Sequence, residues 1–403
     1  MKILYVTYEP PYFPGGMGGQ TRQFCLLKEL VRLHQIDYIG SDLGRAQSEL
    51  LLDLFHHCTF PPQKSFFGRV GSFISKRQDK GYPQFVQQLE PLRKQLEPAI
   101  ERAVSSGKYD LIHVEHSNIA HWVHGIEASI PKILVAQNVK TEMWKRYADN
   151  AKGWRKKRLQ RNYLRFRDYE SRFLLKYNRL VAVSEVDKGF ISNLCPNVPV
   201  SVVANGVDVN YFRSRCEQPQ RDTLVFTGSM AHPPNNEAAL HFCQNIFPKI
   251  LAARPNVRLA IVGSHPSRDV KALDNGHNVK VTGFVEDTRP YLDSAAVVIV
   301  PLLSGSGTRL KILEAMAMGK GIVSTSIGAE GIEYTAGDNI LIADAAETFA
   351  DRVIELLGDV TCCIDLGRSA RILVEQKYSW PILAAQLEKV YFSTLDSRSK
   401  DGG

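Results

Sequence analysis

The most informative stretch of this 403-residue chain reads Pro301-Leu-Leu-Ser-Gly-Ser-Gly-Thr-Arg-Leu-Lys-Ile-Leu-Glu-Ala-Met-Ala-Met-Gly319. The apolar run Ala296–Pro301 is typical of a buried strand, and a Ser/Gly-rich loop follows it. Thr308 is the predicted N-cap of the next helix, and Gly319 stands where that helix should end. A strand, a glycine-containing loop and a helix in this order predict a βα unit of a parallel sheet, with a loop that can meet a ligand.

Two cations in the first turn of this predicted helix break a local rule. Arg309 and Lys311 add positive charge at the end where the helix macrodipole is already positive. A bound diphosphate would resolve the conflict, because backbone N–H groups and both cations would meet its oxygens. Glu314 lies near the same helix face and could accept hydrogen bonds from a ribose diol. The alternatives are solvated cations bound by nearby carboxylates and a simple Lys–Glu pair within the helix.

The rest of the chain repeats the alternation of strands and helices in two halves. This pattern predicts an α/β fold with two doubly wound parallel-sheet domains that face a central cleft. The predicted strands of the first half are Lys2–Tyr8, Ile36–Gly40, Asp110–Val114, Lys132–Ala136, Arg179–Val183 and Val200–Val203. Those of the second half are Thr223–Thr227, Arg258–Val262, Val279–Thr282, Ala296–Pro301, Gly321–Ser324 and Ile340–Ala343. Predicted helices between them include Gln20–Leu33 and Asn235–Leu251.

The polar segment Phe212–Asp222 lacks periodicity and has the composition of a linker. We therefore predict a first domain over residues 1–212 and a second domain over residues 218–377.

The composition is that of an ordinary globular protein, 44% hydrophobic and 23% charged. A net charge of +8 favours anionic partners such as phosphates, membrane surfaces or nucleic acid, or simply a solvated basic surface. The sequence has neither a membrane-spanning apolar run nor a secretory signal pattern, so we expect a cytoplasmic protein. Its seven cysteines lack zinc-ligand spacing, and no aspartate-rich site is evident, so we expect no metal and no resident cofactor.

Several segments together resemble one family. Leu313–Gly319, followed by Gly321–Ser324, resembles the nucleotide-binding helix of retaining family 4 glycosyltransferases, which have the GT-B fold of two Rossmann-like domains. Gly283–Asp287, with Phe284 and Val285, resembles the loop that receives the base. Asn205–Asp208 resembles the motif at the end of the first domain. Tyr378-Ser-Trp380 opens a segment similar to the helix that crosses back, which implies that residues 378–397 pack on the first domain.

The resemblance also implies roles for individual residues. Most such enzymes carry two glutamates separated by seven residues; Glu314 matches the second, whose implied role is the ribose contact, and Ser306 stands in place of the first. Gly307–Lys311 and Phe226–Asn235 resemble a subgroup associated with exopolysaccharide and exosortase systems, in which Arg309 and Lys311 would supply the phosphate charge. The implied donor contacts of this half are Gly228, Ser229, Phe284, Val285, Ser306, Gly307, Thr308 and Glu314.

The loop Glu9–Gly19 follows the first predicted strand and holds four glycines. Gly16, Gly18 and Gly19 would let the backbone approach a ligand closely at a helix N-terminus. The spacing does not match the GxGxxG pattern of a nicotinamide site. The resemblance implies that this loop closes over the donor phosphates and the acceptor, and a plain surface turn is the alternative.

Polar side chains also follow the predicted strands Asp110–Val114 and Lys132–Ala136. His116 could hydrogen-bond a sugar hydroxyl or polarise the reacting group, and we predict it as catalytic together with Arg309 and Lys311. His113 and Asn138 are predicted acceptor contacts. For either histidine the alternative is a core residue with satisfied hydrogen bonds.

Cations and aromatic residues are concentrated in residues 144–167. Apolar residues recur there at helical spacing, so the cations should form one face of a helix. Such a face can dock on an anionic membrane, with Trp144 or Trp154 at the headgroup level and Phe66–Phe73 as a second contact. The alternative is an ordinary solvated helix.

These observations predict a glycosyltransferase. It would move a sugar from a nucleotide-diphosphate donor, with UDP or GDP as the nucleotide, to a glycan or lipid-linked acceptor at the inner face of a membrane. Retention of configuration and a role in cell-surface polysaccharide or glycoconjugate synthesis are implied by the resemblance. The alternatives are a sugar-nucleotide epimerase or hydrolase on the same frame, and a non-catalytic sugar-nucleotide-binding or scaffold protein, suggested by Ser306. A nucleic-acid partner would rest on charge alone and is not expected.

Overall fold

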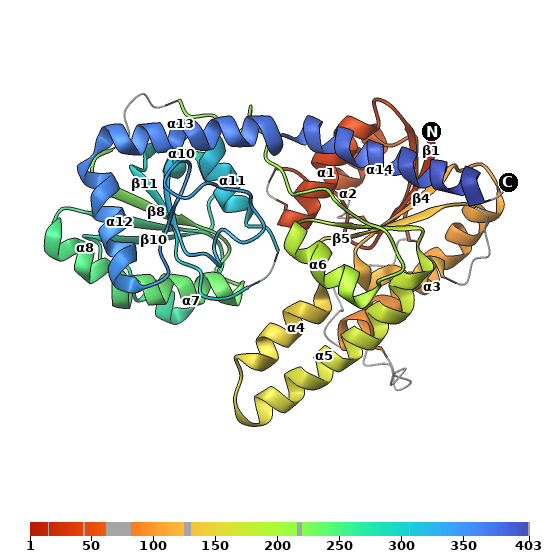
Figure 1. Ribbon diagram of the computed structural model, residues 1–403, viewed down its shortest axis with the longest axis horizontal. Helices are drawn as coiled ribbons and strands as arrows, with labels where there is room; N and C mark the ends of the chain where they lie inside the picture. The colour runs from red at the N-terminus through yellow and green to blue at the C-terminus, as the bar shows by residue number, and fades with distance from the viewer. Residues whose placement is uncertain are drawn as a thin grey trace. The chain divides into compact units, whose positions relative to one another are not determined.

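The computed structural model describes residues 1–14, 16–42, 45–61, 82–124, 130–215, 220–305 and 307–401. It divides into two compact units: unit 1 is Met1–Ala204 with Ala384–Gly403, and unit 2 is Asn205–Leu383. Each unit is a parallel sheet with helices along its faces (Figure 1), which confirms the predicted fold class of two doubly wound domains. Unit 1 ends before the predicted boundary at Phe212. The reason is that Val207 pairs with Ser379, and Arg371 binds the carbonyl oxygens of Val209 and Phe212, so this segment is held by unit 2.

The sheet of unit 1 has the strand order β3-β2-β1-β4-β5-β6-β7, and every pair is parallel. The order reverses between β1 and β4, which is where open α/β sheets place ligands, beyond the carboxyl ends of the strands. The strands are β1 (Lys2–Thr7), β2 (Gln35–Gly40), β3 (His57–Thr59), β4 (Leu111–Glu115), β5 (Lys132–Ala136), β6 (Arg179–Ala182) and β7 (Val200–Val202). Sequence reasoning missed β3, which is short and only partly buried.

The helices of unit 1 include the C-terminal helix of the chain. In order they are α1 (Gly18–Leu30), α2 (Arg45–Leu54), α3 (Gln84–Ser105), η1 (Ser117–Val123), α4 (Lys140–Asp149), α5 (Gly153–Phe173), η2 (Leu174–Lys176), α6 (Glu185–Leu194) and α14 (Trp380–Asp401). Tyr391 of α14 lies 2.8 Å from His113 of β4, so this helix is tied to the sheet. The antiparallel pair α4–α5 extends away from the sheet (Figure 1).

The pair α4–α5 is anchored at one buried carboxylate. Glu170 of α5 accepts hydrogen bonds from the backbone N–H groups of Lys140 and Thr141, at 3.2 and 2.9 Å, and from the hydroxyl of Ser117 at 2.8 Å. It thereby satisfies N–H groups that the first turn of α4 cannot bond internally.

The sheet of unit 2 has the order β10-β9-β8-β11-β12-β13, again parallel, with the reversal between β8 and β11. Its strands are β8 (Thr223–Thr227), β9 (Arg258–Val262), β10 (Val279–Gly283), β11 (Val297–Val300), β12 (Gly321–Ser324) and β13 (Leu341–Ile342). Its helices are α7 (Pro233–His241), η3 (Phe242–Ile246), α8 (Phe247–Ala253), α9 (Arg268–Lys271), α10 (Arg289–Ser294), α11 (Leu310–Ala317), α12 (Ala346–Gly358) and α13 (Val360–Lys377). The single helix predicted over Asn235–Leu251 is three segments, because a π-helical turn separates α7 from α8.

The core of each unit lies between its sheet and its helices. The central strand β11 is Val-Val-Ile-Val, buried at all four positions, as expected for a strand covered on both faces. Burying each such side chain contributes roughly 1.5–3 kcal/mol. In the part of the chain that the structure describes, no helix is long and apolar enough to cross a membrane.

Candidate functional site

The carboxyl ends of β8 and β9 touch through two glycines in unit 2. Gly263, with φ of 156°, lies so close to Gly228 that a Cβ on it would be 1.9 Å from the Gly228 carbonyl oxygen. The N–H of Met230 donates to the carbonyl of Ser264 at 2.8 Å, and the hydroxyls of Ser229 and Ser264 lie 3.1 Å apart. Only glycine permits this approach, so the sequence Gly228-Ser229 positions a tight loop at the edge where β8 ends.

Lys311 reaches this loop from the first turn of α11. Its Nζ donates to Oδ1 of Asn235 at 2.8 Å and lies 4.3 Å above the ring of Phe226. A Cβ on Gly228 would be 2.7 Å from this Nζ, so the glycine also makes room for the cation. Burial, and then the charge of Arg309, lower the pKa of Lys311 to about 7. Lys311 therefore meets an amide and an aromatic face, and no carboxylate forms an ion pair with it in the described residues.

Arg309 precedes α11, which begins at Leu310, so the predicted N-cap at Thr308 is wrong. Gly305 and Gly307 both have positive φ, at 126° and 78°, and they keep the chain out of helical geometry until Arg309 takes the N-cap position. The guanidinium of Arg309 folds back onto the carbonyl of Gly307. Ser306 lies outside the described residues. The helix ends at Ala317 and Gly319 has φ of 63°, which confirms the predicted stop.

Glu314 lies one turn further along α11. Burial raises its pKa to about 7, although nearby Lys311 lowers it. In the described part of the chain its carboxylate has neither a hydrogen bond nor an ion pair. A half-buried carboxylate and a half-buried ammonium thus lie on one short helix without forming an ion pair with each other, and burial of such groups is unfavourable unless polar partners meet them.

The loop after β10 carries an exposed aromatic side chain. Gly283 has φ of 70°, and Phe284 after it is 75% exposed, with Val285 half-buried beside it. Arg289 is fixed nearby by two nitrogens on Asp287, at 2.7 and 3.0 Å, and stacks 3.7 Å from the ring centroid of Tyr211. An exposed ring on a fixed loop can stack on a flat ligand group such as a base.

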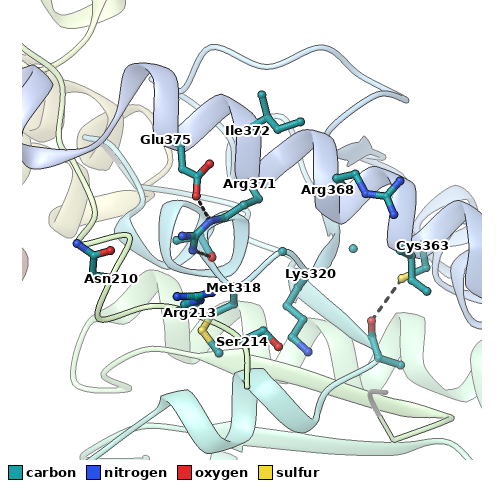
Figure 2. Close-up of a pocket in the computed structure, with 15 residues that line it drawn as sticks. Asn210, Arg213, Ser214, Met318, Lys320, Cys363, Arg368, Arg371, Ile372 and Glu375 are labelled. Carbon is teal, nitrogen blue, oxygen red and sulfur yellow. Dashed lines mark hydrogen bonds and ion pairs between the residues drawn. The ribbon is translucent and has the colours of Figure 1, made fainter. Parts of the chain in front are cut away.

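A second basic region of unit 2 lies at the opposite edge of the sheet, where β11 and β12 begin. A cavity of about 670 Å³ there is lined by Arg213, Lys320, Arg368 and Arg371 (Figure 2). Arg371 donates to the carbonyls of Val209, Phe212 and Ala317 and pairs with Glu375 at 2.6 Å. Lys320 donates to the carbonyls of Asp293 and Ala295, at 2.5 and 3.3 Å. These two cations donate to the protein itself, so their role is structural: they hold neighbouring segments of unit 2 together.

In unit 1 the predicted glycine loop leads directly into α1. Gly18 and Gly19 are its first residues, and Gly18 is exposed. A Cβ on Gly16 would be 2.4 Å from the carbonyl oxygen of Tyr12, so the loop is closely packed there. A Cβ on Gly19 would be 2.6 Å from Oε1 of Gln137 and 2.8 Å from Oε2 of Glu9. The helix N-terminus is therefore covered by polar side chains from the ends of β1 and β5.

His116 lies at this same edge, just after β4. Its φ of 78° is a rare backbone conformation for a residue with a side chain and costs about 1–3 kcal/mol. Nε2 of its buried ring is 3.0 Å from Oε2 of Glu9 and 3.2 Å from the amide of Gln23. The ring of Tyr8 packs against it at a tilt of 48°, with the ring centroids 4.9 Å apart. Backbone strain at a strand end is typical of functional positions.

His113 is a core residue, and its predicted acceptor contact is wrong. The side chain is buried, Nδ1 lies 2.8 Å from the hydroxyl of Tyr391, and Nε2 lies 2.8 Å from Oε2 of Glu115. Because strand residues alternate between faces, His113 turns under α14. Asn138 follows β5, is half-buried and forms no side-chain hydrogen bond in the described residues, so it stays a candidate contact.

The basic segment also needs one correction. Trp144 stacks on Phe166, with ring centroids 6.0 Å apart, and is therefore part of the packing between α4 and α5. Trp154 is 74% exposed. Phe66–Phe73 lies outside the described residues.

Sequence reasoning missed Asn235, Glu9 and Gln23 as site residues. The signal for Asn235 was its place in the Pro-Pro-Asn start of α7. Glu9 and Gln23 had none, because their meeting with His116 depends on the sheet order. Among the described residues, no cluster of three or more His, Cys, Asp or Glu side chains could hold a metal ion.

Comparison with known proteins identifies the class. A family model described as Glycosyltransferase Family 4 matches residues 17–211, and one described as Glycosyl transferases group 1 matches residues 221–359. Sucrose-phosphate synthase from Thermosynechococcus elongatus superposes with a TM-score of 0.73 at 14% identity over 98% of this chain and 99% of that one. HepE from Anabaena, solved with UDP, superposes with a TM-score of 0.66 at 14% identity over 98% and 100%.

These structural matches show the GT-B fold. The chain belongs to the glycosyltransferases of the family 4 and group 1 type, because one model matches most of its first half and the other most of its second half. Among its relatives, the phosphatidyl-myo-inositol mannosyltransferase of Mycolicibacterium smegmatis is 28% identical over 203 residues, which is 47% of this chain and 50% of that protein.

Proposed function

We propose that this protein transfers a sugar from a nucleotide-diphosphate donor to a glycan or lipid-linked acceptor, with retention of configuration. The observation that carries the proposal is the unmatched charge on α11. Lys311 and Glu314 are half-buried, their pKa values are both displaced to about 7, and they do not form an ion pair with each other. A ligand with an anionic diphosphate and a neutral diol would satisfy both groups.

In this proposal the diphosphate lies at the N-terminus of α11. Lys311, Arg309 and N–H groups at the start of the helix meet its oxygens, and Gly228 and Gly307 let the backbone come close. The bond between the anomeric carbon and the diphosphate oxygen breaks, and negative charge grows on the leaving group. Lys311 and Arg309 stabilise this charge directly, because the protein already holds both of them at this end of α11. No resident metal or other cofactor is then needed.

The other proposed donor contacts lie beyond the carboxyl ends of the strands of unit 2, as α11 does. Glu314 accepts from the ribose hydroxyls, Phe284 and Val285 receive the base, and Ser229 and Thr308 bind phosphate or sugar oxygens. UDP and GDP are the nucleotides to test. The structure of HepE contains UDP, and the mycobacterial relative is a mannosyltransferase.

Calorimetric titration with UDP and GDP tests this assignment. Wild-type protein should bind one of the two, and Arg309→Ala should weaken binding about 10- to 100-fold, as expected for a lost charged hydrogen bond. Arg258→Ala is the matched control, since Arg258 is exposed at the opposite end of β9. Absence of binding to either nucleotide in wild-type protein would remove the proposal and leave the family assignment.

The rival functions differ in their products. Epimerised nucleotide sugar, or free sugar formed without an acceptor, would identify an epimerase or a hydrolase. Nucleotide binding with no turnover on any acceptor would identify a binding protein. Product analysis of the donor by NMR separates these outcomes, and the anomeric signal of a transferred sugar reports retention.

We also propose that α5 places the enzyme on an anionic membrane, as would suit a lipid-linked acceptor in cell-surface glycoconjugate synthesis at the cytoplasmic face. One exposed face carries Trp154, Arg158, Arg161, Arg165 and Arg172, and it is separate from the face of the buried Leu159, Phe166 and Phe173. The helix carries eight cations, Arg155, Lys156, Lys157, Arg158, Arg161, Arg165, Arg167 and Arg172. Among the described residues none of them forms an ion pair, so the charge is available to lipid phosphates.

Vesicle co-sedimentation tests this surface. Protein should bind phosphatidylcholine vesicles only when phosphatidylglycerol is included. The triple variant Arg158→Gln, Arg161→Gln and Arg165→Gln should bind roughly 100-fold more weakly, at about 1 kcal/mol for each cation. Lys249, Arg352 and Arg368, exposed in unit 2, provide the matched triple control. Equal loss in both triples would show that net charge, and not this helix face, governs binding.

A further inference from the structure

The ring of His116 is held by two polar side chains at the same nitrogen. Oε2 of Glu9 lies 3.0 Å from Nε2, and the amide of Gln23 lies 3.2 Å from it. An imidazole nitrogen either donates one hydrogen or accepts one, so the direction of these contacts decides which ring nitrogen carries the proton.

The direction is set by the buried carboxylate of Glu115. It can only accept, and it lies 2.8 Å from Nε2 of His113, 2.6 Å from the amide of Gln137 and 3.0 Å from the hydroxyl of Tyr5. Burial opposes its charge, but the hydrogen bond from His113 and the positive field of its neighbours keep the pKa of Glu115 low, at about 2. Tyr5 therefore gives its single hydrogen to this anion.

The consequence passes from Tyr5 to Gln23. The hydroxyl of Tyr5 is 3.1 Å from Oε1 of Gln23, and Nε2 of Gln23 is 3.2 Å from Nε2 of His116. Because Tyr5 gives its hydrogen to Glu115, its oxygen can only accept, so the oxygen and nitrogen of the Gln23 amide must exchange places. Gln23 must turn its NH₂ group toward Tyr5 and its carbonyl oxygen toward His116, an assignment that only the hydrogen-bond network can make. Both neighbours of Nε2, the Gln23 oxygen and the Glu9 carboxylate, are then acceptors.

We infer that Glu9 and Gln23 are positioning residues that hold a proton on Nε2 of His116, so that Nδ1 of the neutral ring is the acceptor offered to a sugar hydroxyl. Nδ1 forms no hydrogen bond with a residue that the structure describes. The catalytic meaning of this tautomer rests on the proposed function, while the tautomer itself does not.

The surroundings of Glu9 support the assignment. Its backbone N–H donates to the hydroxyl of Thr7 at 3.1 Å, and that hydroxyl donates to the carbonyl of Glu9 at 3.0 Å, which fixes the residue after β1. The carboxylate lies over Gly19 at the N-terminus of α1, where an anion is favoured. In the described part of the chain, the other charged groups around this cluster are Glu115 of β4, Lys140 of α4 and, next to Glu115, Arg22 of α1.

Histidine side-chain NMR on ¹⁵N-labelled protein tests the inference without any substrate. The signal of His116 is identified by its loss in His116→Asn, since asparagine tolerates positive φ. Wild-type protein should show the Nε2–H tautomer of the neutral ring, and Glu9→Gln should convert a large part of it to Nδ1–H, because a glutamine amide can donate to Nε2. Gln23→Met, which removes the other acceptor, should shift the population in the same direction.

Glu388→Gln is the matched control, because Glu388 pairs with His34 at 3.0 Å elsewhere in unit 1. It should leave the His116 signal unchanged. A wild-type Nδ1–H tautomer, or a signal that neither Glu9→Gln nor Gln23→Met changes, would overturn the inference whether or not the protein is a glycosyltransferase. If transfer is established, Glu9→Gln should lower kcat about tenfold and leave KM for the donor nearly unchanged.

Discussion

Cations lie at both ends of α11, but they differ in how many hydrogen-bond acceptors the protein places around them. Beyond its C-terminus, Lys320 and Arg371 are surrounded by acceptors (Figure 2). Arg371 alone meets three backbone carbonyls and the carboxylate of Glu375. At its N-terminus, Lys311 has one amide and one aromatic ring, and Glu314 has no polar partner among the described residues. Both ends belong to the same unit, and both have cations around them.

The difference shows how to distinguish a cation that can bind a ligand from a cation that holds segments of the protein together. A cation that already donates to several carbonyls would have to give them up in order to bind a ligand, so it gains little from the exchange. The pKa of half-buried Lys311 is lowered by burial and by the charge of Arg309, and its single amide partner does not offset these effects. The number of satisfied donors is therefore more informative here than the size of the cavity or its net charge.

The largest expected effects, and the strictest test of this comparison, come from removing one cation at each end of α11. Arg371→Ala should lower the free energy of unfolding of unit 2 by about 2–4 kcal/mol, because several buried carbonyls lose their donor, and should leave nucleotide binding unchanged. Lys311→Ala should weaken nucleotide binding roughly 100-fold with little loss of stability. Denaturant unfolding and calorimetry measure the two effects. The comparison fails if both variants lose stability and binding together.

A second prediction concerns the pH dependence of the N-terminal end. The folded-state pKa of Glu314 is about 7 against an ordinary 4.5, so the folded protein binds more protons between these values, and stability falls as pH rises from 4.5 to 7. The pKa of Lys311 is about 7 against an ordinary 10.5, so the unfolded chain binds more protons above pH 7, and stability rises from 7 toward 10.5. The contribution of the pair therefore has its minimum near pH 7.

Glu314→Gln should remove the fall between pH 4.5 and 7 and stabilise unit 2 at neutral pH by on the order of 1–3 kcal/mol. Lys311→Met should remove the rise above pH 7 instead. Denaturant titrations at a series of pH values report both. A wild-type stability maximum near pH 7 that both variants lower would mean that the two groups form a stabilising ion pair.

Much of the region around the N-terminus of α11 could be predicted from the sequence, because its parts are close together along the chain. Strand ends, glycine loops and the cations of α11 lie close together along the chain, and apolar runs such as Val297–Val300 predict buried parallel strands directly. The position of Lys311 and Glu314 on one helix follows from their spacing alone. The start of α11 was misjudged because glycines with positive φ delay the helix, and a threonine before a helical pattern does not reveal that.

The rest depends on residues that only the fold brings together. Glu9, Gln23 and His116 belong to β1, α1 and β4, and they meet because the sheet order places β1 beside β4. His113 was misassigned for the same reason: its partner Tyr391 is 278 residues away in the chain. Arg371 gave no signal, since its role is defined by the carbonyls around it. Hydrogen-bond partners of this kind cannot be predicted from periodicity or spacing.

The smallest expected effect comes from two glycines of unit 2 that both have positive φ. Gly276, with φ of 67°, has open space around its Cβ position, whereas a Cβ on Gly228 would lie 2.7 Å from Nζ of Lys311 and 2.8 Å from Nδ2 of Asn235. Alanine should cost about 1–2 kcal/mol of stability at either position through backbone strain. Gly228→Ala should in addition displace Lys311 and weaken nucleotide binding about tenfold, and Gly276→Ala should not. Equal binding by the two variants in calorimetric titration would mean that the ammonium of Lys311 can move away from Gly228 and still reach the nucleotide, so that its contact with Asn235 is not what positions it.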